Sequence, residues 1–175
     1  AVDSSGNIYA AGYQSGSGAY TYGSQAATAT ASGTNAVIVK YDSSGTALWA
    51  NTVSAGAAAS QFMGLTTDAG GNVFAVGYQT GTGTFTYGGQ SITGGSSGTN
   101  TILVKYSAAG TVLGATALTS GAGNAQFNAV ATDTGGNIYA AGFPLLIKSQ
   151  FPSQFKRLPK NKAQSIAAVR PWACK

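Results

Sequence analysis

The sequence predicts an all-β protein built from a repeated unit, and three observations support this expectation. A segment of sixty-five residues recurs without gaps, because Asp3, Asp68 and Asp133 open near-copies of one stretch. Each copy contains short runs rich in aromatic and β-branched residues, which are typical of strands. No stretch shows the apolar spacing of an amphipathic helix, and Gly, Ser, Thr and Asn are too frequent for helix.

The copies correspond residue by residue. The stretch D-S-S-G-N-I-Y-A-A-G-Y-Q from Asp3 returns as D-A-G-G-N-V-F-A-V-G-Y-Q from Asp68 and as D-T-G-G-N-I-Y-A-A-G-F from Asp133. An ungapped match over a whole period indicates one duplicated supersecondary unit whose neighbours pack in the same way. The repeat array is assigned to residues 1–143, with periods 3–67 and 68–132 and a partial third at 133–143.

Strand signals follow one another along the first period. Asn7 to Tyr13 and Ala36 to Tyr41 are aromatic and β-branched runs bounded by D-S-S-G and G-T-N turn sequences. Leu48 to Val53 and Phe62 to Thr67 are weaker candidates, and a glycine-rich connection runs from Ser15 to Ser32. Because short strands linked by turn sequences pair with one another, the expectation is four antiparallel strands in each period.

Four-stranded units repeated at a long period suit the blades of a β-propeller, because only neighbouring blades can cover the two bare faces of a blade. D-S-S-G-N-I-Y from Asp3, N-A-V-I-V-K-Y-D-S-S-G from Asn35 and the pair Leu48-Trp49 resemble the bacterial β-propeller repeat often called the SBBP repeat. The resemblance covers residues 1–143 and implies a seven-bladed propeller in a secreted or surface-exposed bacterial protein, usually without an assigned activity.

The second copy departs from this pattern at two positions. Ser107 replaces Asp42 and Gly114 replaces Trp49, so neither Asp42 nor Trp49 has a role that every blade must fulfil.

The number of copies does not close a propeller ring. Propellers typically have about four to eight blades, whereas this chain carries two periods and eleven matching residues of a third. We therefore expect a piece of a longer protein, and the alternative is a ring assembled from several chains. A parallel β-helix is the alternative fold, although no shorter sub-period is found inside the sixty-five residues.

The composition changes abruptly at residue 143. All 26 Gly precede Phe143 and all four Pro follow it. Residues 1–143 carry two Lys and four Asp, whereas residues 144–175 carry seven Lys and Arg and no acid. The sequence thus predicts a basic, Pro-containing tail that is irregular or disordered. It is either an out-of-frame translation product or a genuine arm for anionic lipid or a nucleic-acid backbone.

The residues that most catalytic and metal sites need are missing. The chain has no His, which removes Ser-His-Asp and Cys-His sites and the commonest metal ligand. The single Cys174 allows no intrachain disulfide and no multi-cysteine metal site. The four acids lie far apart, so a carboxylate pair would have to join different blades. We expect no catalytic residue, no cofactor and no metal.

The recurrent D-x-x-G-N turn is expected to be structural. Its carboxylate can accept backbone N–H bonds, while Gly and Asn adopt positive φ at low cost. Calcium binding is the functional alternative, but the D-x-D-x-D-G series of oxygen ligands is absent. The turn residues are Asp3, Gly6, Asn7, Asp68, Gly71, Asn72, Asp133, Gly136 and Asn137.

Two recurrent features are candidates for surface binding. A lysine at the centre of an apolar strand could line an anion-attracting channel, but such lysines more often rest on apolar neighbours and prevent edge pairing. Alternating aromatic residues could stack on sugars, but more often they pack between blades. The candidates are Lys40, Lys105, Tyr20, Tyr22, Phe85 and Tyr87.

We expect a non-enzymatic scaffold that serves as an adhesion or protein-interaction module. The alternative is a carbohydrate-binding or hydrolytic propeller whose active residues lie on blades missing here. The expected partner is an unknown protein or glycan, with neighbouring blades or other copies completing the ring. No specific nucleic acid is expected, and no apolar run is long enough for a transmembrane segment.

Overall fold

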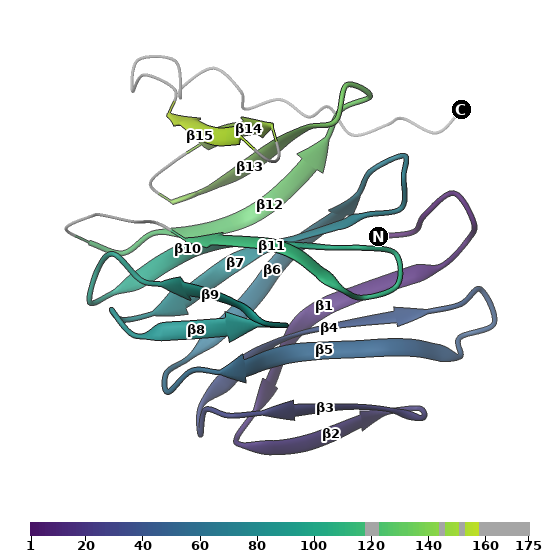
Figure 1. Ribbon diagram of the computed structural model, residues 1–175, viewed down its shortest axis with the longest axis horizontal. Helices are drawn as coiled ribbons and strands as arrows, with labels where there is room; N and C mark the ends of the chain where they lie inside the picture. The colour runs from purple at the N-terminus through teal and green to yellow at the C-terminus, as the bar shows by residue number, and fades with distance from the viewer. Residues whose placement is uncertain (118–122, 144–145, 151–152, 158–175) are drawn as a thin grey trace, which may run out of the picture.

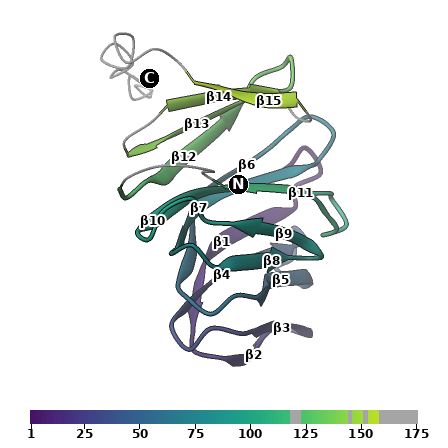
Figure 2. The same cartoon turned by 60° about the vertical axis from the view of Figure 1, so that its left-hand side comes forward.

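The computed structural model of the chain describes residues 1–117, 123–143, 146–150 and 153–157. Its regular elements are all strands, without a helix among these residues, and the strand pairs are antiparallel. Separate sheets stack face to face as layers (Figures 1 and 2). The all-β prediction is therefore confirmed. The parallel pairing that a β-helix requires is not found in the described ranges.

The first period folds into six strands, two more than predicted. Four of them contain the predicted runs apart from Asn7, whereas the other two form a hairpin inside the connection expected from Ser15 to Ser32. Gly23, with φ of 60°, allows the tight turn of this hairpin. The strands are β1 (Ile8–Ser15), β2 (Gly18–Tyr22), β3 (Gln25–Ala29), β4 (Thr34–Tyr41), β5 (Ala47–Ala55) and β6 (Ser60–Thr67).

The second period repeats this order of strands, as the ungapped match of the two sequences predicts. Its long strands again flank a short hairpin, here formed by β8 and β9. The strands are β7 (Val73–Thr80), β8 (Thr84–Tyr87), β9 (Gln90–Thr93), β10 (Thr99–Tyr106), β11 (Val112–Ala117) and β12 (Gln126–Thr132).

The partial third period contributes β13 (Asn137–Phe143) and is followed by β14 (Leu146–Gln150) and β15 (Ser153–Arg157). The last two strands differ from the irregular structure expected for residues 144–175. They extend the sheet from β13, whose edge would otherwise expose unpaired backbone N–H and C=O groups. The rest of this segment, including Cys174, lies outside the described residues.

The sheets do not coincide with the sequence periods. The second sheet has the order β11-β10-β7-β6, so its strand β6 comes from the first period. The third sheet, β12-β13-β14-β15, takes β12 from the second period in the same way. In the opposite direction, the hairpin β8–β9 joins β5 and gives the first sheet the order β1-β4-β5-β8-β9. Strands therefore cross the junction between the first two periods in both directions.

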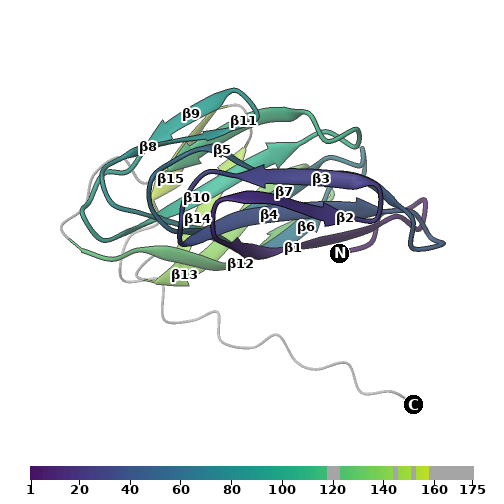
Figure 3. The same cartoon turned by 90° about the horizontal axis from the view of Figure 1, so that it is seen from below.

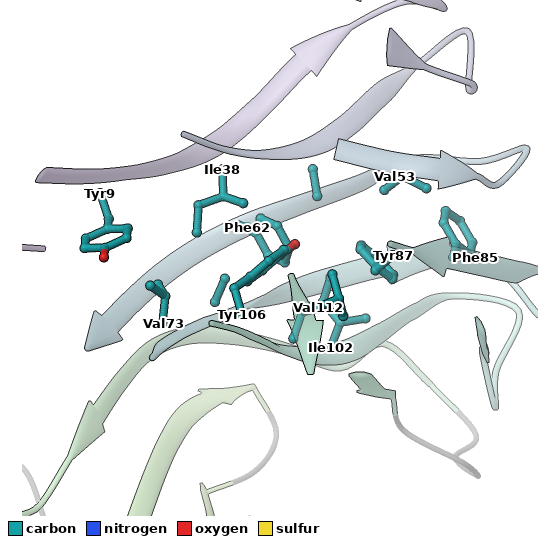
Figure 4. Close-up of a cluster of buried hydrophobic side chains, with 13 residues drawn as sticks. Tyr9, Ile38, Val53, Phe62, Val73, Phe85, Tyr87, Ile102, Tyr106 and Val112 are labelled. Atoms are coloured by element: carbon teal, nitrogen blue, oxygen red, sulfur yellow. The ribbon is translucent and has the colours of Figure 1, made fainter. Parts of the chain in front are cut away.

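The main apolar core lies between the first and second sheets. Tyr9 and Ile38 from the first sheet face Phe62 and Tyr106 from the second, and all four side chains are buried (Figure 4). The ring centroid of Phe62 lies 6.4 Å from that of Tyr106, in an edge-on arrangement. These rings exclude water from the interface, which is the main source of stability for stacked sheets.

A second core lies between the second and third sheets. Phe74 and Leu103 of the second sheet pack there with Phe127 and Ile138 of the third. Because neighbouring residues of a strand point to opposite faces, β7 and β10 are apolar on both sides. The second sheet is therefore covered on both faces.

Candidate interaction surface

The carboxylate of Asp3 holds the first D-x-x-G-N turn. Its Oδ1 accepts the N–H groups of Ser5 at 2.9 Å and Asn7 at 3.0 Å. Its Oδ2 accepts the side-chain amide of Asn7 at 2.9 Å and the hydroxyl of Tyr9 at 3.0 Å. Gly6 has φ of 79°, which glycine adopts without steric cost. The carboxylate of Asp3 is thus occupied inside its own turn.

The other two copies form the same turn. Asp68 accepts the backbone N–H of Asn72 at 2.9 Å and its side-chain amide at 2.8 Å. Asp133 accepts the same two groups of Asn137 at 2.8 and 2.7 Å. No group of three His, Cys, Asp or Glu that could hold a metal occurs in the part of the chain that the structure describes. The glycines of the two turns have positive φ, at Gly71 (76°) and Gly136 (75°).

These hydrogen bonds shift the pKa values of their partners. Partial burial raises the pKa of Asp3, but the bonds from Asn7, Tyr9 and Ser5 outweigh it and lower that pKa to about 2. Burial and the bond to Asp3 raise the pKa of Tyr9 to about 12. Since neither group titrates near neutrality, this pair is suited to holding a turn and not to general acid–base catalysis.

Lys40 connects the first two sheets. Its side chain is 7% exposed, and its Nζ donates to the carbonyl of Ala108 at 3.0 Å and lies 5.2 Å from the ring centroid of Tyr9. The Nε1 of Trp49 donates to the same carbonyl at 3.1 Å. Lys40 therefore binds a turn of the second period to the first sheet, and it does not line an open channel.

Lys105 has different neighbours, although it occupies the equivalent position in the second period. Its Nζ lies 5.2 Å from the ring centroid of Phe74. It is paired across the strands with Gly114, whereas Lys40 is paired with Trp49. The replacement of Trp49 by Gly114 thus removes the indole that accompanies the first lysine.

The aromatic candidates divide between core and surface. Phe85 and Tyr87 of β8 are each 1% exposed and belong to the main core. As candidates for a ligand-stacking surface they are therefore corrected, because they pack in the core between the first and second sheets. Tyr20, which is equivalent to Phe85, is 43% exposed, and Tyr22 is half-buried. Only the two tyrosines of β2 reach an accessible surface.

The accessible surface extends from β2 over the first sheet. Ile8 is 42% exposed, whereas its equivalent Val73 is 0% exposed. Ala10 is likewise exposed and its equivalent Ala75 is buried. Figure 3 looks at the molecule from this side and shows the hairpin β2–β3 in front of the first sheet. We call this surface the outer face, and it consists of Ile8, Ala10, Tyr20, Tyr22 and Tyr41.

The outer face is not a feature that sequence reasoning identified as a whole. Sequence reasoning included Tyr20 and Tyr22 among its candidates but missed Ile8 and Ala10, because these two residues look like ordinary strand residues in the sequence. A comparison of the two periods could have identified Ile8 and Ala10, because these positions are apolar in both copies.

Comparison with known proteins finds no matching family model and no matching curated protein. The resemblance to the SBBP repeat therefore stays a prediction. Among the described residues there is also no helix long and apolar enough to cross a membrane.

Proposed function

We propose that the chain is part of a non-enzymatic β-propeller-type scaffold of a secreted or surface-exposed bacterial protein, and that it binds a protein or glycan. The observation that carries this proposal is the outer face. Its residues are apolar or aromatic, and their counterparts in the second period are buried against a sheet of the same kind. Apolar and aromatic side chains that are exposed together on one sheet face are typical of a surface that binds another molecule.

The arrangement of the sheets supports the propeller-type architecture. The second sheet is four-stranded and antiparallel, and it is packed face to face between its neighbours (Figure 2). The blades of a propeller are also four-stranded antiparallel sheets that pack face to face. Further sheets, from a longer chain or from other copies, would complete a ring.

The hydrogen bonds of the acids support the non-enzymatic part of the proposal. All four carboxylates of the chain accept backbone N–H bonds in their own turns. Glycoside hydrolysis needs one carboxyl group that donates a proton and a second that acts as base or nucleophile. Each of the four Asp side chains instead holds its own turn.

The test compares two exposed apolar positions. The full chain is attached to fluorescent beads, and binding is measured on a glycan array and between beads. Tyr20→Ser should reduce binding several-fold, whereas Leu113→Ser should leave it unchanged, because Leu113 is 50% exposed but lies outside the outer face. Binding to the array would identify a glycan as the partner. Hydrolysis of glycoside substrates by the purified chain would overturn the scaffold proposal.

A further inference from the structure

The basic residues of the chain are unevenly distributed with respect to proteolysis. Trypsin-type serine proteases cut after Lys or Arg, which their acidic specificity pocket selects. Residues 1–143 contain two such positions, Lys40 and Lys105, whereas residues 144–175 contain seven. A protease cuts inside a folded domain only after the strand that holds the bond has opened. The strand pairing around each basic residue therefore decides where such a protease can act.

Lys40 lies in a strand that is paired on both sides. It is opposite Tyr9 of β1 and opposite Trp49 of β5. Its side chain, which a protease would have to take into its pocket, is buried and donates to the carbonyl of Ala108. Cleavage after Lys40 therefore requires that two strand pairings and the contact with the second period are broken first.

The backbone pairing of Lys105 gives the same protection. Lys105 is opposite Phe74 of β7 and Gly114 of β11. The residue that follows it, Tyr106, is buried in the main core, and both faces of the second sheet are covered. Neither lysine of residues 1–143 can thus be cut without opening a central strand.

The two adjacent basic residues of β15 are placed differently. Lys148 is still central, because it is opposite both Tyr139 of β13 and Lys156 of β15. Lys156 and Arg157 are the last two residues of β15, which pairs with β14 at three positions with a shift in register. Arg157 is the last of these paired residues, so the bond that follows it lies beyond the paired part of the strand.

We propose that the bond after Arg157 is a processing site for a protease of trypsin-type specificity, which separates residues 1–157 from the residues that follow. In this step water adds across the bond between the carbonyl carbon of Arg157 and the nitrogen of Leu158. Arg157 then ends in a carboxylate, and Leu158 begins with a new amino group. The extended backbone of β15 up to Arg157 has the conformation in which strand-type recognition binds a peptide.

Processing at this bond changes the charge of the protein. The whole chain carries nine Lys and Arg against four Asp, a net charge of +5. Residues 1–157 keep five of the basic residues and all four Asp, which leaves +1. Cleavage thus removes most of the attraction to anionic surfaces. The biological role of this site rests on the secreted or surface-exposed location of the proposed function, but not on binding by the outer face.

The test treats the full chain with a low concentration of trypsin and follows the products by intact-mass spectrometry. A product that ends at Arg157 should accumulate and persist. Cleavage after Lys40 or Lys105 should be at least a hundredfold slower than in the chain unfolded in urea. Cleavage at either lysine before the residues beyond 157 are lost would overturn the proposal, and so would a persistent product that retains those residues.

Glutamine variants test the assigned bond. Lys156→Gln combined with Arg157→Gln should move the end of the persistent product to Lys160, the next basic residue. Lys148→Gln is the matched control and should leave the cut at Arg157, because Lys148 is paired on both sides. A double variant whose persistent product ends at Lys148 would place the accessible bond inside β14 and contradict the assignment.

The processing site and the scaffold function can fail separately. Resistance of the Arg157 bond, together with bead or glycan binding that depends on Tyr20, would reject the processing site and leave the scaffold function intact. Cleavage at Arg157 in a chain that binds neither beads nor glycans would support the processing site and reject the scaffold function.

Discussion

The indole of Trp49 lies against Gly110 of the following period, so that a Cβ added at Gly110 would lie 2.8 Å from its Cδ2. The contact is reinforced by Asn51, whose side-chain amide donates to the carbonyl of Gly110 at 2.9 Å. Gly45 is the equivalent residue of the first period and has the same φ of 86°, but nothing lies within 4 Å of its Cβ position. The two glycines therefore share a backbone conformation, but only Gly110 is buried against a tryptophan of the preceding period.

This difference predicts unequal effects of the same substitution. Alanine in the left-handed conformation costs about 1–2 kcal/mol, and this cost applies to both Gly45→Ala and Gly110→Ala. Overpacking against Trp49 adds about 1–3 kcal/mol for Gly110→Ala alone. The free energy of unfolding, measured by denaturant titration, should therefore fall by about 1–3 kcal/mol more for Gly110→Ala than for Gly45→Ala. Equal losses for the two variants would contradict the contact.

Asp68→Ala should lower the free energy of unfolding by about 0.5–2 kcal/mol, by analogy with the loss of a helix N-cap. The variant removes the acceptor of the backbone N–H and the side-chain amide of Asn72. Asp68→Asn should cost less, because an amide oxygen can still accept the backbone N–H. Thermal melting monitored by circular dichroism measures both. An unchanged melting temperature for Asp68→Ala would rule out the capping role.

Acid should destabilise the fold through Asp3. Its pKa is lowered from 3.8 to about 2 in the folded chain, so the carboxylate favours folding when it is charged. That contribution is complete above the unfolded pKa and disappears as the pH falls from about 4 towards 2. The melting temperature should therefore drop over this range, and less steeply in Asp3→Asn. The same slope in both proteins would exclude Asp3 as a contributor.

Lys40→Met tests the two interpretations of the recurrent lysine. Methionine keeps much of the apolar stem but loses the hydrogen bond from Nζ to Ala108, so a loss of about 1.5–3 kcal/mol in unfolding free energy is expected. Lys40→Ala should cost more, since it also removes packing on Tyr9. A phosphate-dependent rise in melting temperature that Lys40→Met abolishes would instead favour an anion-binding role.

The long strands were predictable because their signals are local. The run expected at Ala36 to Tyr41 lies within β4, which begins two residues earlier, and the run expected at Asn7 to Tyr13 overlaps β1, which begins one residue later and ends two residues later. The hairpin β2–β3 was not predicted, since its second strand β3 has the sequence Q-A-A-T-A, in which the alanines have weak strand propensity. It is fixed by a distant contact, in which the buried Gln14 donates from Nε2 to the carbonyl of Ala27 at 3.0 Å.

The candidate surface was predictable only in part, for a related reason. The spacing within D-x-x-G-N suffices to infer a carboxylate that accepts N–H groups of its own turn. Exposure depends on which sheets lie alongside, so Tyr20 and Phe85 have equivalent sequence positions but are 43% and 1% exposed. The partner of Lys40 is likewise contributed by the next period, at Ala108.

The exchange of strands between the periods has a mechanical consequence. Strand β6 passes forward into the second sheet, while the hairpin β8–β9 reaches back to β5. Tension that separates the first two periods must therefore break backbone hydrogen bonds in two sheets during the same event. A protein built in this way resists stretching at the joints between its units, where arrays of independently folded domains have only a linker.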